Sequence, residues 1–302
     1  MRTDIPVQQR PPWYFSLLQE WNLAGYRGAV FLLRRLRSVG LLDKCSAYPL
    51  GGSESILIPL HFSSLWERKS MEGYEREAID VFAMHAGLLG DETILVDCGA
   101  DIGLFSRLVL RQAKNIATVV AFEPNPASYS VLRRNLEKLP IKVVALQAAV
   151  SNESGQGRLQ SVEGRSSYDN HSKFIQLDPA GSIDVRTIDE TLDVTPNTSL
   201  AIKIDVEGNE LAVLEGAAKS IAAARHVVIQ IEAHPDVARR TGVDPIECLK
   251  FIHGIRPVRF VVCERPQFSL SLDRPFFDQL DRDAIFNVLA TSVMEDDAAS
   301  AR

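Results

Sequence analysis

Residues 94–103 read I-L-V-D-C-G-A-D-I-G, and this stretch decides the fold of the chain. The apolar run that ends at Asp97 is typical of a buried β-strand, and the small residues after it predict a tight turn. A helical pattern begins at Leu104. Glycines let the backbone approach a ligand, and the first N–H groups of a helix have no partner within the helix. The stretch therefore predicts a cradle for a nucleotide-like ligand, although the same pattern also occurs in βα turns that bind nothing.

Composition narrows the class of protein. The 302 residues are 46% hydrophobic and 24% charged, which is typical of a soluble globular chain of one or two domains. A net charge of −6 disfavours a general nucleic-acid binder, whose domain is usually basic. Four cysteines without C-x-x-C spacing predict free thiols and a cytoplasmic location. A polar, proline-containing start predicts no signal peptide, and no run approaches the roughly 18 apolar residues of a transmembrane helix.

From residue 94 onward, short apolar strands alternate with helical patterns. We expect strands at 94–97, 117–122, 141–149, 200–206, 226–231, 259–263 and 284–290, and helices at 74–89, 104–113, 126–139, 209–223 and 245–254. This alternation predicts a largely parallel sheet with helices on both faces.

The flanking segments are less regular. We expect an N-terminal helical extension over 1–50, the main domain over 51–292 and a disordered tail over 293–302. The basic, apolar segment 26–42 predicts an amphipathic helix. We expect this helix to pack on its own domain, and the alternative is that it lies on an anionic membrane surface. The N-terminal helices, with Trp13, Tyr14 and Trp21, are expected to form core, a lid or a homodimer interface. Residues 151–182 are expected to form a hairpin or a loop, followed by an edge strand at 183–187.

Polar residues end the predicted strands. They are Asp97, Glu123, Ser151, Asp205, Glu207, Glu232 and His234. Ligands of open α/β sheets lie beyond the carboxyl ends of the strands, and a carboxylate is costly to bury without a partner. These residues therefore predict one edge of the sheet that faces hydroxyls, amines or a cation. Glu123 stands where an acidic side chain accepts bonds from both ribose hydroxyls; the alternative is a surface residue that caps the next helix.

The turn lacks the middle glycine of the dinucleotide fingerprint, which serves close contact with a pyrophosphate. This favours a ligand with an adenosine and no phosphates. S-adenosylmethionine is such a ligand, and its ammonium and sulfonium charges agree with acidic strand ends.

Several motifs together resemble one family. They are V-D-C-G-A-D-I-G at 96–103, A-F-E-P-N-P at 121–126, Arg134-Asn135, A-A-V-S-N at 148–152, T-I-D-E at 187–190 and I-K-I-D-V-E-G-N-E at 202–210, with G-Y-E-R-E at 73–77 before them. The chain resembles the FkbM family of S-adenosylmethionine-dependent methyltransferases over roughly residues 50–235. The resemblance implies a Rossmann-like class I methyltransferase fold with a mostly parallel seven-stranded sheet.

The resemblance also implies roles for single residues. The residues that would line the methionine part of the cofactor are Asp97, Gly99, Ala100 and Gly103. Glu123 would hold the ribose, Asp205 would lie near the methionine amine, and Asn125, Ser151 and Asn152 would lie near the adenine. Asp101 departs from the usual Asn of the family. It is expected to cap the helix at 102 or 103 and to accept a bond from the ligand ammonium.

Known members of the family largely methylate hydroxyl oxygens, often on sugars or polyketides. The resemblance thus implies an O-methyltransferase that acts on a hydroxyl of a glycan or secondary metabolite. A hydroxyl that attacks the methyl must lose its proton, and Glu207 and His234 are the candidate bases. Their alternatives are a helix cap for Glu207 and a plain loop residue for His234. Lys203 alternates with Asp205 along one strand, so both face the same side. We expect Lys203 to pair with a carboxylate, and the alternative is that it orients the substrate.

Other interpretations remain at this stage. The chain could be a nicotinamide-dependent oxidoreductase on a related sheet, or a non-catalytic module that keeps the cofactor fold. Mg²⁺ is not indicated by any spacing, although Asp205, Glu207 and Glu232 have the oxygen ligands that it prefers. A small-molecule or glycan acceptor would be contacted by the polar residues of the 151–182 segment, unless that segment is an ordinary solvated loop. They are Arg165, Ser166, Ser167, Tyr168, Asn170 and His171.

Overall fold

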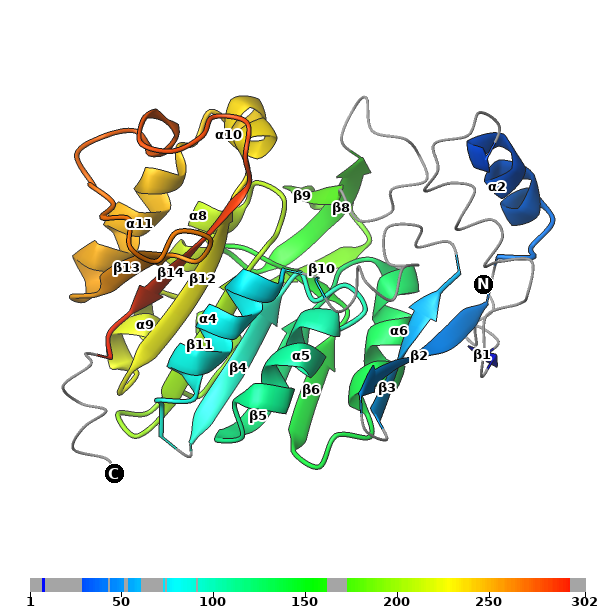
Figure 1. Cartoon of the computed structure of the whole chain (residues 1–302), viewed down its shortest axis with the longest axis horizontal. Helices are drawn as coiled ribbons and strands as arrows, with labels where there is room; N and C mark the ends of the chain where they lie inside the picture. Colours follow the sequence, from blue (N-terminus) through cyan, green and yellow to red (C-terminus); the bar gives the residue numbers. More distant parts are fainter. Residues whose placement is uncertain are drawn as a thin grey trace.

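The computed structural model describes residues 7–8, 29–42, 44–51, 54–60, 73, 75–90, 92–161 and 173–293 (Figure 1). Its centre is a seven-stranded sheet of order β13–β14–β12–β11–β4–β5–β6. The strands are β4 (Thr93–Cys98), β5 (Ile116–Phe122), β6 (Lys142–Leu146), β11 (Ser199–Ile204), β12 (Val227–Ala233), β13 (Arg259–Val262) and β14 (Phe286–Thr291). Only β14 runs antiparallel to its neighbours; the pairs between β12 and β6 are all parallel. The predicted fold class is confirmed.

Helices cover both faces of this sheet (Figure 1). They are α4 (Arg76–Ala86), α5 (Leu104–Gln112), α6 (Pro126–Leu136), α8 (Glu210–Glu215), α9 (Ala218–Ala223) and α11 (Pro245–Ile255), while α10 (Pro235–Thr241) lies beyond the end of β12 (Figure 1). Successive strand residues face opposite sides, so Leu95 packs in the cluster with α4 and α5 while Val96 packs in the cluster with α8, α9 and α11. Strands buried on both faces read as continuous apolar runs, which is why their positions could be predicted.

The chain order places a switch point between two central strands. The chain runs from β4 outward to β5 and β6, and then returns to β11 on the other side of β4. Ligands of such sheets bind outside the carboxyl ends of the strands at this point. We call the edge where the parallel strands end the carboxyl edge. There the turns after β4 and β11 touch, because a Cβ added to Gly99 would lie 1.9 Å from the backbone oxygen of Asp205.

The strand predicted at 141–149 is two strands. Only β6 belongs to the main sheet, while β7 (Ala148–Val150) joins a second sheet of order β7–β10–β8–β9 with β8 (Gly155–Ser161), β9 (Lys173–Leu177) and β10 (Ile183–Arg186). The prediction that β10 is an edge strand is wrong, because it lies between β7 and β8. Hydrophobic alternation shows that a segment is extended, but it does not show where the chain leaves one sheet for another. The predicted hairpin is confirmed as the antiparallel pair β8–β9.

The helix predicted at 209–223 is also divided, into α8 and α9. The break is at Gly216, where a Cβ would lie 2.1 Å from the backbone oxygen of Ser151. Helix α10 follows β12 directly and was not predicted. This helix has only seven residues, which are too few to show the helical spacing of apolar residues by which longer helices are predicted.

The N-terminal part contributes a small sheet as well as helix α2 (Ala29–Ser38). Strands β2 (Cys45–Gly51) and β3 (Glu54–Pro59) form an antiparallel hairpin, and β1 (Val7–Gln8) pairs with β2. Tyr48, Ile56 and Ile58 pack against α5 and α6, and Asn135 bonds both backbone groups of Leu57. The predicted boundary at residue 50 therefore falls within a hairpin. The sequence at 55–60 predicts a short strand at a sheet edge, because Pro59 has no N–H to donate to a neighbouring strand. The structure confirms this, since β3 is an edge strand of the small sheet.

Several predictions of the flanks lie outside the described residues. These are Trp13, Tyr14 and Trp21, the polar residues at 165–171 and the tail from 294. No helix among the described residues is long and apolar enough to cross a membrane. The four cysteines are free and buried, which confirms the prediction of free thiols.

Candidate active site

The glycine turn after β4 is fixed by its backbone. Gly99, Asp101 and Gly103 have φ values of 79°, 47° and 83°, so three of five residues are left-handed. The N–H groups of Gly99 and Ala100 both donate to the Phe122 oxygen, at 3.0 and 2.9 Å. The turn is therefore tied to the end of β5 by hydrogen bonds within the protein.

Glu123 completes this connection. It is 7% exposed, and its two carboxylate oxygens accept the N–H groups of Asp101 and Asn125 at 2.8 and 2.7 Å. The alternative of a surface residue that caps α6 is wrong, because Asn125 is the cap and accepts the Ala127 N–H. Burial, followed by the nearby Asp101 carboxylate, raises the pKa of Glu123 to about 8. Each carboxylate oxygen keeps a further lone pair for a ligand hydroxyl.

Asp101 lies two residues before Gly103, the N-cap residue of helix α5, and its expected role as a cap of that helix stays a prediction. The left-handed φ of Asp101 gives a different reason for the residue type, since Asn and Asp adopt this conformation more readily than other residues with a side chain. Asp in place of the usual Asn therefore suits the backbone and adds a negative charge.

A buried lysine connects the two central strands. Lys203, 4% exposed on β11, donates to Asp205 Oδ2 at 2.9 Å and to the Gly99 oxygen at 3.3 Å. Its Nζ lies 4.0 Å from Oδ1 of Asp97, which faces it across β4. The predicted pairing of Lys203 with a carboxylate is confirmed.

Asp97 is fully buried and only half satisfied. Its Oδ2 accepts the Ser106 hydroxyl at 2.6 Å, whereas its Oδ1 accepts no hydrogen bond from any residue that the structure describes. Burial raises the pKa of Asp97, and Lys203 opposes this increase. One lysine between two carboxylates leaves an excess of negative charge at the switch point, and this suits a cationic ligand.

A second acidic group lies farther along the carboxyl edge. Burial raises the pKa of Glu232 well above its ordinary value, and the charges of Asp205, Glu75 and Glu207 raise it further. Glu75, at the start of α4 with a φ of 41°, belongs to this group although sequence reasoning had given it no role. The available signal was its position in the G-Y-E-R-E motif. Glu210, whose pKa burial also raises, was missed as well.

The loop after β11 is held by an arginine from α10. Glu207 has a φ of 57°, and Arg240 donates to its backbone oxygen and lies 3.9 Å from its Oε2. The guanidinium of Arg240 also lies 5.0 Å from the centroid of the Phe174 ring on β9. The N-cap residue of α8 is Asn209, whose side chain makes no capping bond, and the alternative that Glu207 caps this helix stays open. Arg240 was not found from the sequence, because the short helix α10 that carries it was not predicted.

His234 is the cap of α10 rather than a plain loop residue. Its Nδ1 accepts the Asp236 N–H at 3.1 Å. A neutral imidazole whose Nδ1 accepts a bond carries its proton on Nε2, which is then a donor. This geometry favours a carboxylate over His234 as a base.

Of the three residues predicted near an adenine, Asn125 and Ser151 are buried and Asn152 is exposed. Asn125 Nδ2 is buried without a hydrogen-bond partner among the described residues. Ser151 is buried and accepts a bond from Asn209 at 3.2 Å, which places it beside the loop after β11. Asn152 is exposed and bonds Glu215 of α8. No three His, Cys, Asp or Glu side chains in the described part of the chain are placed to hold a metal ion, and this includes Asp205, Glu207 and Glu232.

A mostly parallel seven-stranded sheet with one antiparallel strand, a glycine turn after β4 and acidic strand ends define a Rossmann-like class I methyltransferase. The chain belongs to the FkbM methyltransferase family: the methyltransferase FkbM domain matches residues 97–254.

The chain is also similar to two named methyltransferases and to one solved structure. The hexuronic acid methyltransferase AglP of Haloferax volcanii is 28% identical over 192 residues, which cover 62% of this chain and 71% of that protein. The methyltransferase sdnD of Sordaria araneosa is 28% identical over 222 residues, a match that covers 62% of this chain and 77% of that protein. A crystal structure of methyltransferase FkbM from Methylobacillus flagellatus KT is 18% identical with a TM-score of 0.41; the match covers 74% of this chain and 60% of that one.

Proposed function

We propose that this protein transfers the methyl group of S-adenosylmethionine to a hydroxyl oxygen of a glycan or secondary metabolite. The observation that carries the proposal is the buried Asp97–Lys203–Asp205 group at the switch point, whose excess negative charge suits a cationic ligand. The family supports methyl transfer. AglP, named for hexuronic acid, supports a sugar-like acceptor.

The residues present fit this cofactor. The free Oδ1 of Asp97 and the carboxylate of Asp205 would accept bonds from its ammonium. Glu123 would accept the ribose hydroxyls with its remaining lone pairs, and Asn125 Nδ2 would donate toward the adenine. The bound cofactor supplies an electrophilic methyl group on a sulfonium. The protein's part is to orient the acceptor and to take up the proton of its hydroxyl.

A carboxylate is the proposed base. Glu207 is held at the carboxyl edge by Arg240, whereas His234 uses its Nδ1 to cap α10. Glu232 is the second candidate for this role. Its pKa is raised above that of an ordinary carboxyl group, and an efficient base has a pKa near the working pH. Lys203 holds carboxylates and is nearly fully buried, so we assign it no contact with the acceptor.

Two measurements test the proposal. Isothermal calorimetry with S-adenosylhomocysteine should show binding, and NAD⁺ should show none. Extracts incubated with the protein and isotopically labelled S-adenosylmethionine should contain, by mass spectrometry, a compound that gains one methyl on oxygen. Glu207→Gln and Glu232→Gln would then identify the base. Binding of NAD⁺ in place of S-adenosylhomocysteine would reject the methyltransferase in favour of a nicotinamide enzyme.

A further inference from the structure

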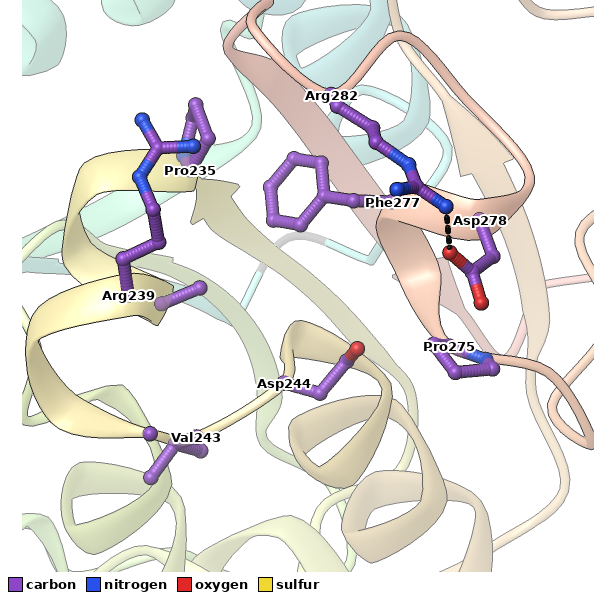
Figure 2. A pocket seen from close by; sticks show the side chains of 10 residues that line it. Pro235, Arg239, Val243, Asp244, Pro275, Phe277, Asp278 and Arg282 are labelled. Carbon is purple, nitrogen blue, oxygen red and sulfur yellow. Dashed lines mark hydrogen bonds and ion pairs between the residues drawn. The ribbon is translucent and has the colours of Figure 1, made fainter.

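A pocket of about 330 Å³ lies between α10 and the segment that joins β13 to β14 (Figure 2). Helix α10 begins directly after β12, and β13 runs parallel to β12 because both pair antiparallel with β14. Both walls therefore rise from the carboxyl edge, the same edge that carries Asp205 and Glu207. The volume is at the lower end of the roughly 300–1,000 Å³ typical of small-molecule sites.

The walls of the pocket combine apolar surfaces with hydrogen-bonding groups of both kinds. Pro235, Pro275 and Phe277 supply the apolar surface. Arg239 on α10 and Arg282 on the opposite wall are paired with Asp236 and Asp278 at 2.5 Å each. Their side chains are 62% and 74% exposed, and each guanidinium has further N–H groups to donate.

Phe277 is held in place by the protein itself. Its neighbour Phe276 is fully buried, and the two rings meet edge to face with centroids 5.1 Å apart. Asp244 caps α11 through the Ile246 N–H and also accepts the Phe276 N–H. The aromatic wall is therefore part of the packed structure of the protein.

This lining indicates the class of ligand. The pocket presents two arginines and two aspartates, so it has no excess charge that would select an anion or a cation. A hydroxyl group both donates and accepts, and a ring with several hydroxyls uses arginine and aspartate together. The carbon face of such a ring packs on an aromatic side chain. We propose that the pocket holds a sugar ring of the acceptor, with Phe277 against the ring and Arg239, Arg282 and Asp278 bonded to its hydroxyls. This inference rests on the proposed function and narrows its acceptor to a glycan.

Helix α10 connects the pocket to the proposed base. Arg239 lines the pocket, and the next residue, Arg240, holds the Glu207 backbone. A Cβ added to Gly208 would lie 2.7 Å from Thr241, so the last turn of the helix also lies against this loop. One helix thus forms a wall of the pocket and also contacts the loop that bears Glu207, the proposed base.

The test is ligand-observed saturation-transfer NMR on the full chain, with and without S-adenosylhomocysteine. The probes are a pool of methyl glycosides of hexoses, 6-deoxyhexoses and hexuronic acids. We expect at least one sugar to bind, and both Phe277→Ala and Arg239→Gln to weaken its binding at least fivefold. Arg133→Gln, which removes an exposed arginine from α6, is the control and should leave binding unchanged.

The outcomes separate this inference from the proposed function. If S-adenosylhomocysteine binds but no sugar of the pool does, or if sugar binding is equal in all variants, the sugar pocket is refuted and the methyltransferase stands. If sugar binds as expected and S-adenosylhomocysteine does not, the proposed function fails. Arg239 is largely exposed, so Arg239→Gln remains decisive even if Phe277→Ala lowers the thermal unfolding midpoint.

Discussion

The two halves of the carboxyl edge are built in different ways. The β4–β5 half, with the glycine turn and Glu123, is held by backbone N–H groups and short local connections. The β11–β12 half instead gathers carboxylates at the strand ends, Asp205, Glu207 and Glu232, with Glu75 and Arg240 brought to them from distant segments. A rigid backbone cradle suits a constant cofactor, whereas side chains on separate helices and loops can change with the acceptor. The predictions below test this division, from the largest expected effect to the smallest.

Lys203 is the contact on which both halves depend. Lys203→Met should lower the free energy of unfolding by about 3–5 kcal/mol, because it leaves Asp97 and Asp205 as uncompensated carboxylates in a buried site. Urea denaturation measures the change. Lys250→Met, which breaks an exposed pair with Glu247 on α11, should cost no more than about 1 kcal/mol. Equal losses in the two variants would show that the buried lysine is not the link between the halves.

Glu123 should control the β4–β5 half. Glu123→Ala removes the acceptor of two backbone N–H groups and the predicted partner of the ribose. We expect affinity for S-adenosylhomocysteine to fall about 100-fold, which is about 2.7 kcal/mol, as measured by calorimetry. Glu137→Ala at the end of α6 serves as the control. A change of less than about threefold in Glu123→Ala would contradict the assignment.

The raised pKa of Glu123 gives the unbound protein a pH dependence. An unfolded Glu titrates near 4.5 and the folded one near 8, so the folded state holds the proton more tightly between these values. The contribution to stability is then complete below about pH 4.5 and is lost as pH rises through 8, at about 1.4 kcal/mol per pKa unit at most.

Denaturant titrations of wild type and Glu123→Gln between pH 5 and 8.5 measure this contribution. Because the amide does not titrate, the stability of wild type relative to the variant should decrease steadily over the range. A constant difference would mean that the carboxyl group is already ionised at pH 5.

Arg240 should affect only the β11–β12 half. Arg240→Gln removes the charged donor to the Glu207 backbone and should speed amide hydrogen exchange at 205–209 about tenfold, a local loss of about 1.4 kcal/mol. Exchange at 99–103 should not change, because that turn is tied to β5. Faster exchange in both segments would mean that the two halves open together.

Asp101 is expected to matter least. Asp101→Asn should change stability by less than about 0.5 kcal/mol, because both residues tolerate the left-handed backbone, whereas Asp101→Val should cost about 1–2 kcal/mol. Removing its charge should also lower the pKa of Glu123. Thermal unfolding and the pH titration above measure both effects. A large loss of stability in Asp101→Asn would mean that the carboxylate makes a stabilising contact within the protein that the amide cannot replace.

The sequence determined what lies close together along the chain. Buried parallel strands are apolar along their length, so β4, β5, β11 and β12 and the polar residues that end them could be located, and Pro59 marked an edge strand. The glycine turn and Glu123 belong to one strand–turn–helix–strand unit, and their proximity follows from that connectivity.

The tertiary structure decided which distant groups meet. It divided 141–149 between two sheets, broke a helix at Gly216 where Ser151 approaches, made His234 a helix cap, and brought Glu75 and Arg240 to the carboxyl edge. The sugar pocket likewise forms between the short helix α10 and the segment that joins β13 to β14, neither of which shows a regular spacing of apolar residues. Periodicity reports which face of an element is buried, but partners across long loops are set by the packing of whole elements, which no local pattern encodes.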